Sequence, residues 1–284
     1  MTMVNHENLR ARAYVLRTIR AFFDSRGFVE VETPVRIPAP APEPHIDCPA
    51  SGEWFLRASP ELQMKKILAS GMPLIYQIGP CFREGENGSR HSPEFTMLEW
   101  YRANADYVDM ARDIESLVGE VLWRDSTPPV FAHISVRDAF LRWAGWDPVA
   151  SWDQDRFDFD MAVKVEPSLP GGPVFLEDYP APAASLSRLK AEDPRIAERW
   201  ELYVDGMELA NAFSELTDAE EQRRRFEEAK EERKMLGEAD YPIDVEFLSA
   251  LKGMPPSGGV ALGVDRLAML AARVRSISEI RVPA

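Results

Sequence analysis

Residues 82–101 read FREGENGSRHSPEFTMLEWY, and this stretch decides the fold that we expect for the whole chain. Its first half is a charged loop that contains glycine, and its second half alternates like a β-strand. The side chains that share one face of that strand are Phe95, Met97, Glu99 and Tyr101. An aromatic ring, a carboxylate and a phenol on one wall suit a pocket for a cationic ligand, although an ordinary hairpin with polar edges has the same composition.

The elements before this stretch alternate between helices and strands. Apolar residues recur at helical spacing near the N-terminus, residues 28–32 alternate as a strand, and the proline-rich residues 34–52 read as a loop. Ser59 and Pro60 start a further helix, with Pro60 expected at its first position. Residues 74–83 then read as a strand that leads into the charged loop.

The elements after this stretch are less regular. An apolar stripe over residues 107–121 predicts a long helix. Residues 146–172 show no clear period. Thr217 and Glu220 predict a capping box before a highly charged helix that ends at Gly237. We expect the charged residues of that helix to form a solvated face.

A second informative stretch is RWELYVDGMELANAFSEL, residues 199–216. Asp205 and Gly206 lie between two strand-like runs and predict a two-residue hairpin turn. In that hairpin Glu201 and Glu208 share a face as diagonal neighbours, and carboxylates so close repel unless a cation lies between them. We therefore expect a Mg²⁺ site that bridges to phosphate oxygens, with an exposed acidic pair as the ordinary alternative.

The end of this stretch alternates in the same way, with Asn211, Phe213 and Glu215 on one face of the second strand. A perfectly regular ladder would put that face opposite Glu208. We therefore expect a bulge or twist near residues 210–212, because only an irregular strand lets both sets line one pocket.

A third stretch, PPSGGVALGVDRLAML at residues 255–270, reads as a loop, a short strand and a helix. Its glycines would let a ligand approach the backbone, and Arg266 falls in the first turn of the helix. Arginine there suits contact with a phosphate or stacking on a base. Tight packing of the core would explain the glycines equally well.

The composition bounds the class of protein. The chain has 284 residues with 45% hydrophobic and 28% charged residues, no stretch long enough for a membrane helix and no secretion signal. Cys48 and Cys81 have no metal-ligand spacing. We expect one cytoplasmic domain over residues 1–284. A net charge of −14 disfavours a polyanion such as tRNA as the partner.

The three stretches, taken in order, resemble the catalytic domain of class II lysyl-tRNA synthetases. GFVEVETP at residues 27–34 is similar to motif 1 of that family, residues 82–101 are similar to motif 2, and GGVALGVDR is similar to motif 3. The resemblance implies an α+β fold with an antiparallel sheet flanked by helices, a homodimer, and formation of an aminoacyl-adenylate from ATP. Motif 1 would contribute to the dimer interface.

The resemblance also implies a nucleotide site. Arg83 matches the catalytic arginine that holds both the α-phosphate and the amino-acid carboxylate. Phe95 and Arg266 match the pair that sandwiches adenine. Glu201 and Glu208 match the acids that bind Mg²⁺. The other positions that match ATP contacts are Glu84, Gly85, His91, Ser92, Leu209 and Gly263.

A diamino-acid site follows from the same resemblance. Ser59, Pro60 and Glu61 match the wall that receives the α-amino end of the substrate. The groups that match those around its side-chain amine are Glu99, Tyr101 and Glu215, and the pocket is completed by Asn211, Phe213 and Ala261. Two carboxylates and a phenol also agree with the need to desolvate an ammonium group.

Some positions depart from the full-length lysyl enzymes. The chain has FREG where the family commonly has FRNE or FRDE, and Ala212 and Ala261 stand where glycine is usual. The sequence also begins at the motif 1 helix, and we expect no anticodon-binding domain. These features resemble a truncated branch of the family that attaches lysine or (R)-β-lysine to a lysine of elongation factor P. The alternatives are another acceptor (tRNA, a carrier protein or a small amine) or a catalytically silent regulatory subunit.

Overall fold

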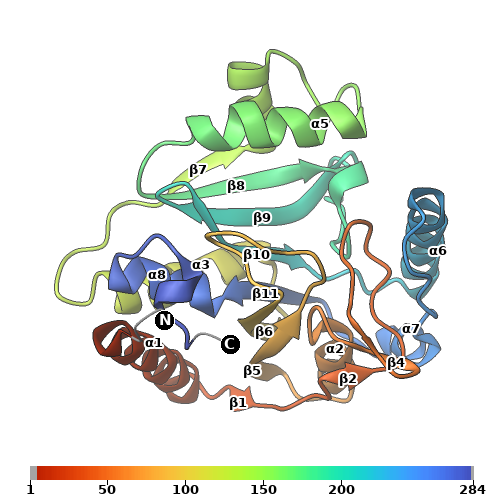
Figure 1. The fold of residues 1–284 in the computed structure, drawn as a ribbon. Coiled ribbons are helices and arrows are strands. Elements are labelled where there is room, and N and C mark those ends of the chain that lie inside the picture. Colours follow the sequence, from red (N-terminus) through yellow and green to blue (C-terminus); the bar gives the residue numbers. More distant parts are fainter. Residues whose placement is uncertain (1–4, 283–284) are drawn as a thin grey trace.

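The computed structural model describes residues 5–282, and an eight-stranded sheet lies at its centre (Figure 1). The order of strands across the sheet is β1 (Val29–Glu30), β5 (Leu74–Phe82), β6 (Glu94–Ala103), β11 (Ser257–Gly263), β10 (Met207–Ser214), β9 (Ile196–Val204), β8 (Pro173–Pro180) and β7 (Ala132–Ser135). Neighbouring strands are antiparallel except at the two edges, where β1 and β7 run parallel to their partners. The expected α+β architecture is confirmed.

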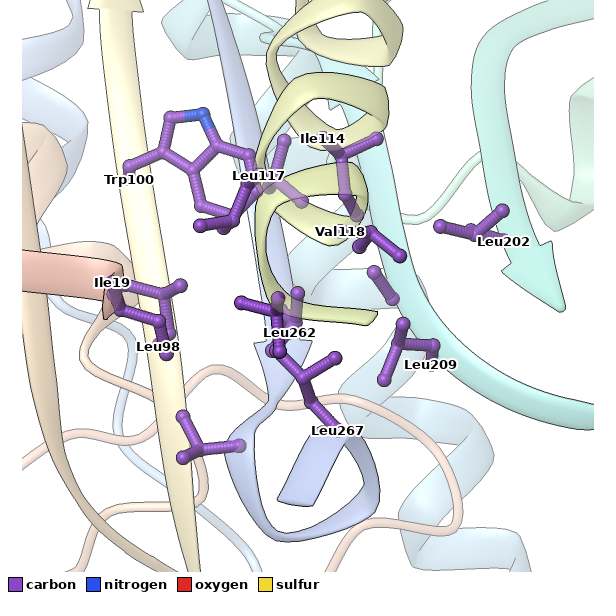
Figure 2. Packing of buried hydrophobic residues seen from close by; sticks show 14 of the residues in the cluster. Ile19, Leu98, Trp100, Ile114, Leu117, Val118, Leu202, Leu209, Leu262 and Leu267 are labelled. Atoms are coloured by element: carbon purple, nitrogen blue, oxygen red, sulfur yellow. The ribbon is translucent and has the colours of Figure 1, made fainter. Parts of the chain in front are cut away.

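Helices cover the two faces of this sheet unequally. The first face carries α1 (His6–Ser25), α3 (Tyr107–Leu122) and α8 (Val264–Ala272), and their apolar side chains form one large cluster with it. Figure 2 shows the centre of this cluster. The second face carries α2 (Glu61–Ala69) and α7 (Val245–Leu251) at one end, with α6 (Ala219–Leu236) beside them (Figure 1). The rest of the second face holds the polar side chains discussed below.

The alternation along β6 fixes which side chains reach which face. Leu98 and Trp100 are fully buried in the cluster of the first face, whereas Tyr101 packs in the cluster that includes α2 and α7. Burying one large apolar side chain stabilises the fold by about 1.5–3 kcal/mol. A slip of β6 by one residue would bring these apolar groups to the polar face, so the core holds the register of the candidate site.

A separate layer lies beyond β8 and includes residues 146–172, which showed no sequence period. It contains α4 (Val136–Ala139) and α5 (Gln154–Asp160), each of which continues into a π-helical turn. Phe140 stacks on Phe157 at a centroid distance of 4.8 Å within a third apolar cluster. The π-helical and 3-10 turns in the molecule are Phe140–Ala144, Met161–Val165, Glu166–Ser168, Ala181–Ala183 and Ile277–Glu279. Such turns shift the helical spacing, which explains the absent period.

Two predictions near the N-terminus, one of a strand and one of a loop, were wrong in extent. The strand expected over residues 28–32 is reduced to the two residues of β1. The stretch 34–52 is not entirely loop, because β2 (Arg36–Ile37) and β3 (Ala50–Ser51) pair with β4 (Trp54–Leu56) in a small sheet. Proline lacks a backbone donor and confines both strands to two residues each.

Two predicted helix starts are displaced by one residue. Pro60 is the N-cap of α2 rather than its first residue, and the hydroxyl of Ser59 accepts the backbone N–H of Glu61 at 2.9 Å. The cap of α6 is Asp218, which accepts from two backbone amides, and not Thr217. An aspartate caps as well as threonine does, so sequence spacing alone did not separate them. Within residues 5–282, no helix combines the length and apolar character needed to cross a membrane.

Candidate active site

Two connected cavities lie on the second face of the sheet, where β6, β11, β10 and β9 run side by side. The outer cavity has a volume of about 250 Å³ and is lined by the charged loop, β9, β10 and the start of α8. The inner cavity, about 70 Å³, lies between β6, β10 and the start of α2. Arg83, Met97, Asn211 and Ala261 line both cavities. One ligand that spans this junction would contact both.

The outer cavity collects most of the residues predicted to bind ATP. The predicted residues that line it are Arg83, His91, Ser92, Phe95, Glu201, Glu208, Leu209, Asn211, Ala261, Gly263 and Arg266. Leu209 contributes little polar surface, because it is 2% exposed and packs in the apolar cluster shown in Figure 2. Arg83 lies over the ring of Phe95, with 5.2 Å between its guanidinium carbon and the ring centroid.

The inner cavity collects the residues predicted to bind the amino acid. The predicted residues that line it are Ser59, Glu61, Arg83, Glu99, Tyr101, Asn211, Phe213, Glu215 and Ala261. They come from α2, β6, β10 and β11 and from the segments next to them, so the inner cavity exists only in the folded sheet. Its polar groups are mostly buried: Glu99 and Glu215 are each 1% exposed.

Three predicted residues do not line either cavity. Pro60 caps α2, and its neighbours Ser59 and Glu61 face the inner cavity in its place. Glu84 and Gly85 lie at a turn of the charged loop where Gly85 has a φ of +79°, and both are exposed. The turn carries them away from the outer cavity and brings Glu86 to its wall instead. No sequence signal distinguished Glu86 from its neighbours.

The hairpin between β9 and β10 explains how the acids reach one wall. Asp205 and Gly206 form its turn with positive φ at both positions, and Tyr203 pairs with Glu208 as predicted. The register then shifts between Glu208 and Ala210, so that Asn211 faces Glu201. The expected irregularity is therefore present, slightly earlier than predicted. Because of it, Glu201, Glu208 and Asn211 all line the outer cavity.

Arg266 is held at the outer cavity by contacts of its own side chain and by a contact of the preceding residue. Its Nη1 donates to the backbone oxygen and to Oε2 of Glu208, at 2.7 and 3.0 Å, and its Nη2 lies 2.7 Å from Nε2 of His91. The next residue back, Asp265, is buried and accepts the backbone N–H of Thr96 at 2.8 Å. This bond ties the first turn of α8 to β6 and fixes the direction of the arginine.

Glu99 forms the centre of a hydrogen-bond network in the inner cavity. Its two carboxylate oxygens accept from the hydroxyls of Ser59, at 2.7 Å, and Tyr101, at 2.9 Å. Burial raises the pKa of Glu99 to about 7, and the charge of Glu61 adds to the rise. A cation that enters the cavity would reverse this effect, since it favours the charged carboxylate.

A buried lysine pairs with two acids that line the inner cavity, and the sequence prediction missed it. Lys65 is 1% exposed, and its Nζ is paired with Glu61 and with Glu215. The same ammonium lies 5.2 Å from the ring centroid of Phe213. Burial lowers the pKa of Lys65, but the two carboxylates outweigh it and the net shift is upward. The spacing of Glu61 and Lys65, four residues apart on a helix, was a readable signal.

The wall of the inner cavity also explains one glycine of the third stretch. A Cβ at Gly259 would lie 2.2 Å from Oε1 of Glu215 and 2.5 Å from a ring carbon of Tyr101. Contacts this short do not occur, so these two side chains can approach β11 only at a glycine. Of the two explanations that the sequence left open, Gly259 fits tight packing, because it makes room for protein side chains.

Arg199 and Glu43 also line the outer cavity without having been predicted. Arg199 is mostly buried, donates to Oε1 of Glu201 at 2.7 Å and to Oδ1 of Asn211 at 3.2 Å, and lies over the ring of Tyr179. Glu43, from the proline-rich segment, lines both the outer and the inner cavity. A proline-rich segment gives no pattern that would single out one carboxylate.

Two acids of the outer cavity could hold a magnesium ion if a bound nucleotide supplied further ligands. Among the described residues no group of three or more His, Cys, Asp or Glu side chains forms a metal cage. Mg²⁺ commonly takes only one or two carboxylates together with substrate phosphates and water. Glu201 and Glu208 supply such a pair on one wall, where each is held by a guanidinium group.

The sheet is mainly antiparallel, and arginines from a charged loop and from the start of a helix line a cavity on its polar face. This arrangement is typical of the catalytic core of class II tRNA synthetases. The model of the family "tRNA synthetases class II (D, K and N)" matches residues 1–282, and the chain belongs to this family.

Three curated relatives match nearly the whole chain. The chain is 39% identical over 310 residues to the elongation factor P–(R)-β-lysine ligase of Proteus mirabilis, a match that covers 96% of this chain and 93% of that protein. The enzymes of the same name from Edwardsiella ictaluri and Yersinia enterocolitica are 41% and 38% identical, with the same coverage. The resemblance stated from the motifs is confirmed, and the chain is an ATP-dependent ligase.

Proposed function

We propose that the protein activates lysine or (R)-β-lysine with ATP as an adenylate and transfers it to a lysine side chain of elongation factor P. The junction of the two cavities at Arg83 carries this proposal. An adenylate joins a nucleotide to an amino acid through the α-phosphate, so its two halves require adjoining cavities with a cation between them. Arg83 lines both cavities, and its buried Nε has no hydrogen-bond partner in the described part of the chain.

The charges of the inner cavity favour a diamino acid. With Glu61, Glu99 and Glu215 ionised and Lys65 protonated, the cavity holds two negative charges in excess, while Glu43 and Arg83 balance each other at its mouth. The two ammonium groups of lysine or β-lysine would neutralise this excess. A monoamino acid would leave a buried charge uncompensated, which is costly.

In the first step the substrate carboxylate attacks the α-phosphorus of ATP, and pyrophosphate leaves. Phe95 and Arg266 would enclose the adenine ring, while Arg83 orients the carboxylate and stabilises charge on the phosphate. Glu201 and Glu208 would hold a magnesium ion, which neutralises charge on the phosphates of the nucleotide. The contribution of the protein is therefore positioning and electrostatics, and no side chain acts as a nucleophile.

The preferred isomer and the acceptor rest on further observations. Ala261 lines both cavities and pairs with Glu99 on β6 and with Asn211 on β10, so its methyl group lies where the backbone end of the amino acid would bind. A methyl there favours an amine displaced by one carbon. Elongation factor P as acceptor is supported by the names of the relatives and by the net charge of −14, which disfavours tRNA.

We also propose that the chain acts as a homodimer. Strand β1 lies at the edge of the large sheet, consists of two residues and exposes Val29, which is 46% accessible. An edge strand with an exposed apolar side chain is suited to pairing with a second copy. Sedimentation equilibrium would measure the mass in solution, and a monomer would contradict the proposal.

The function is tested in two stages with purified protein. Exchange of pyrophosphate into ATP is measured with each lysine isomer, and incorporation is then measured by mass spectrometry with elongation factor P and separately with tRNA. We expect exchange that depends on a lysine isomer, and a mass increase of elongation factor P only. Exchange without modification of the factor would favour another acceptor. Absence of exchange with every isomer would favour a silent regulatory subunit.

A further inference from the structure

A third cavity opens next to the junction of the outer and inner cavities. This side cavity has a volume of about 440 Å³ and lies between β9, α5 and the segment around Glu43. It shares Glu43, Asn211, Glu201 and Arg199 with the outer cavity, and Glu43 and Asn211 with the inner cavity. A molecule in the side cavity would therefore reach the junction while the other two cavities hold the adenylate.

The wall of the side cavity suits a cationic ligand. Its carboxylates include Asp158, Glu166 and Glu232, and Arg199 is the guanidinium among the residues that line it. In addition, the hydroxyl of Tyr179 is buried on this wall beside Glu201. The acceptor amine of the proposed reaction has both the charge and the hydrogen-bonding capacity required.

Glu43 and Asn211 line all three cavities, and the carboxylate of Glu43 is distinct from the other carboxylates there. The other carboxylates that line the outer and inner cavities each have a hydrogen bond or an ion pair. Within the described residues, the carboxylate of Glu43 has neither. Its backbone is fixed instead, since the buried Arg233 of α6 donates to the carbonyl oxygens of Glu43 and Ile46 at 2.8 and 3.1 Å.

We propose that Glu43 accepts the proton of the acceptor amine in the transfer step, and that this amine enters through the side cavity. The inference rests on the proposed adenylate chemistry. The neutral amine nitrogen attacks the carbonyl carbon and the C–N bond forms. The C–O bond to the phosphate then breaks, and its electron pair leaves with AMP. The proton that the nitrogen must lose goes to the Glu43 carboxylate. An acceptor that arrives as ammonium loses its first proton to water before the attack.

The surroundings of Glu43 agree with this role. Burial, and secondarily the charge of Glu61, raise the pKa of Glu43 above its ordinary value, while Arg83 and Arg199 oppose the rise. A carboxylate with a raised pKa is a stronger proton acceptor than an exposed one, and nearby guanidinium groups keep it from being protonated too early.

The test compares the two half-reactions in Glu43→Gln, Glu43→Asp and the control Glu53→Gln. Glu53 is exposed at the turn between β3 and β4, so its change removes the same charge away from the cavities. For Glu43→Gln we expect transfer to elongation factor P to fall roughly 100-fold or more, and pyrophosphate exchange to fall less than tenfold. Glu43→Asp retains a carboxylate and should transfer faster than Glu43→Gln. Exchange also reports whether each variant is folded.

Hydroxylamine provides the decisive comparison, because it is so weakly basic that water can take the proton that its nitrogen loses on attacking the adenylate. The rate of hydroxamate formation should be within a few fold of the unmodified enzyme in Glu43→Gln, although transfer to the factor is lost. Equal losses in exchange, hydroxamate formation and transfer would show a structural role and overturn the inference, as would unchanged transfer. If the unmodified enzyme leaves elongation factor P unmodified, the proposed acceptor is wrong. Transfer is then measured with a small alkylamine in place of the factor. A loss of this transfer in Glu43→Gln, with hydroxamate formation kept, would support the role of Glu43, and equal losses would overturn it.

Discussion

The ammonium nitrogen of Lys65 lies 2.5 Å from Oε2 of Glu215, and both side chains are almost completely buried. Glu215, whose carboxylate we expect to contact the side-chain amine of the substrate, is therefore already paired with Lys65. This pairing keeps the inner cavity stable before the amino acid binds, because Glu61, Glu99 and Glu215 would otherwise repel one another without any compensating charge.

Replacement of Lys65 by methionine should destabilise the protein markedly. Removing one partner of a buried ion pair costs about 3–5 kcal/mol, since the other partner stays buried without a counter-charge. Thermal or urea unfolding would measure the loss. The control Lys252→Met changes an exposed lysine next to α7 and should stay within about 0.5 kcal/mol of the unmodified protein. A Lys65 variant as stable as this control would contradict the role that we assign to the pair.

Binding of the amino acid should depend on pH through Glu99. Its pKa of about 7 in the folded protein exceeds the ordinary value of 4.5, so its contribution to stability is present below pH 4.5 and is lost as the pH rises through 7. Bound ammonium favours the ionised carboxylates, and so the affinity for the amino acid should rise as the pH rises through 7. Burial also raises the pKa of Glu215, to about 8, so the affinity should level off only above pH 8. Calorimetry at pH 6 in two buffers should show release of a proton on binding. No release would contradict this assignment.

The isomer preference should respond to the methyl group of Ala261. Ala261→Gly should improve the use of α-lysine relative to (R)-β-lysine by about 1–3 kcal/mol, roughly 10- to 200-fold in the ratio of kcat/KM. Ala212→Gly is a matched control, because Ala212 is in the adjacent strand but packs in the apolar core. That control should lower stability and leave the ratio unchanged. Equal ratios in both variants would show that Ala261 does not select the isomer.

The magnesium requirement should involve Glu208. Chelation of Mg²⁺ should abolish pyrophosphate exchange, and added Mg²⁺ should restore it. Glu208→Gln keeps an oxygen that can accept from Arg266 but removes the charge, so the Mg²⁺ concentration for half-maximal exchange should rise by at least about tenfold. Glu53→Gln again serves as the control. An unchanged Mg²⁺ requirement in the Glu208 variant would place the metal elsewhere.

Local patterns predicted part of the fold and of the candidate site, and the other site residues followed only from the resemblance to a known family. Alternation over residues 94–101 placed Phe95, Met97, Glu99 and Tyr101 on one face, and the cavities contain all four. The turn at Asp205 and Gly206 predicted the pairing of Tyr203 with Glu208. Both signals act over a few residues, where the spacing of side chains depends only on backbone geometry.

The parts that could not be predicted depend on contacts between distant segments. The position of Glu43 is set by Arg233, which is 190 residues away along the chain. The bulge was foreseen, but its place between Glu208 and Ala210 follows from how β10 packs on β9 and β11. Glu84 was expected at the nucleotide by its position in motif 2, and only the turn at Gly85 shows that it points elsewhere.

The hydrogen bonds from Arg233 of α6 to the segment around Glu43 limit how α6 can be redesigned. By its charge, α6 looks like a segment that can be shortened or recoded to improve solubility or crystallisation. Arg233 is 1% exposed, however, and binds the loop of Glu43 through three oxygen atoms, those of Glu43, Ile46 and Asp47. A redesign of the helix surface should therefore keep Arg233. Replacing it would free the backbone of the proposed proton acceptor Glu43, although α6 itself could still fold.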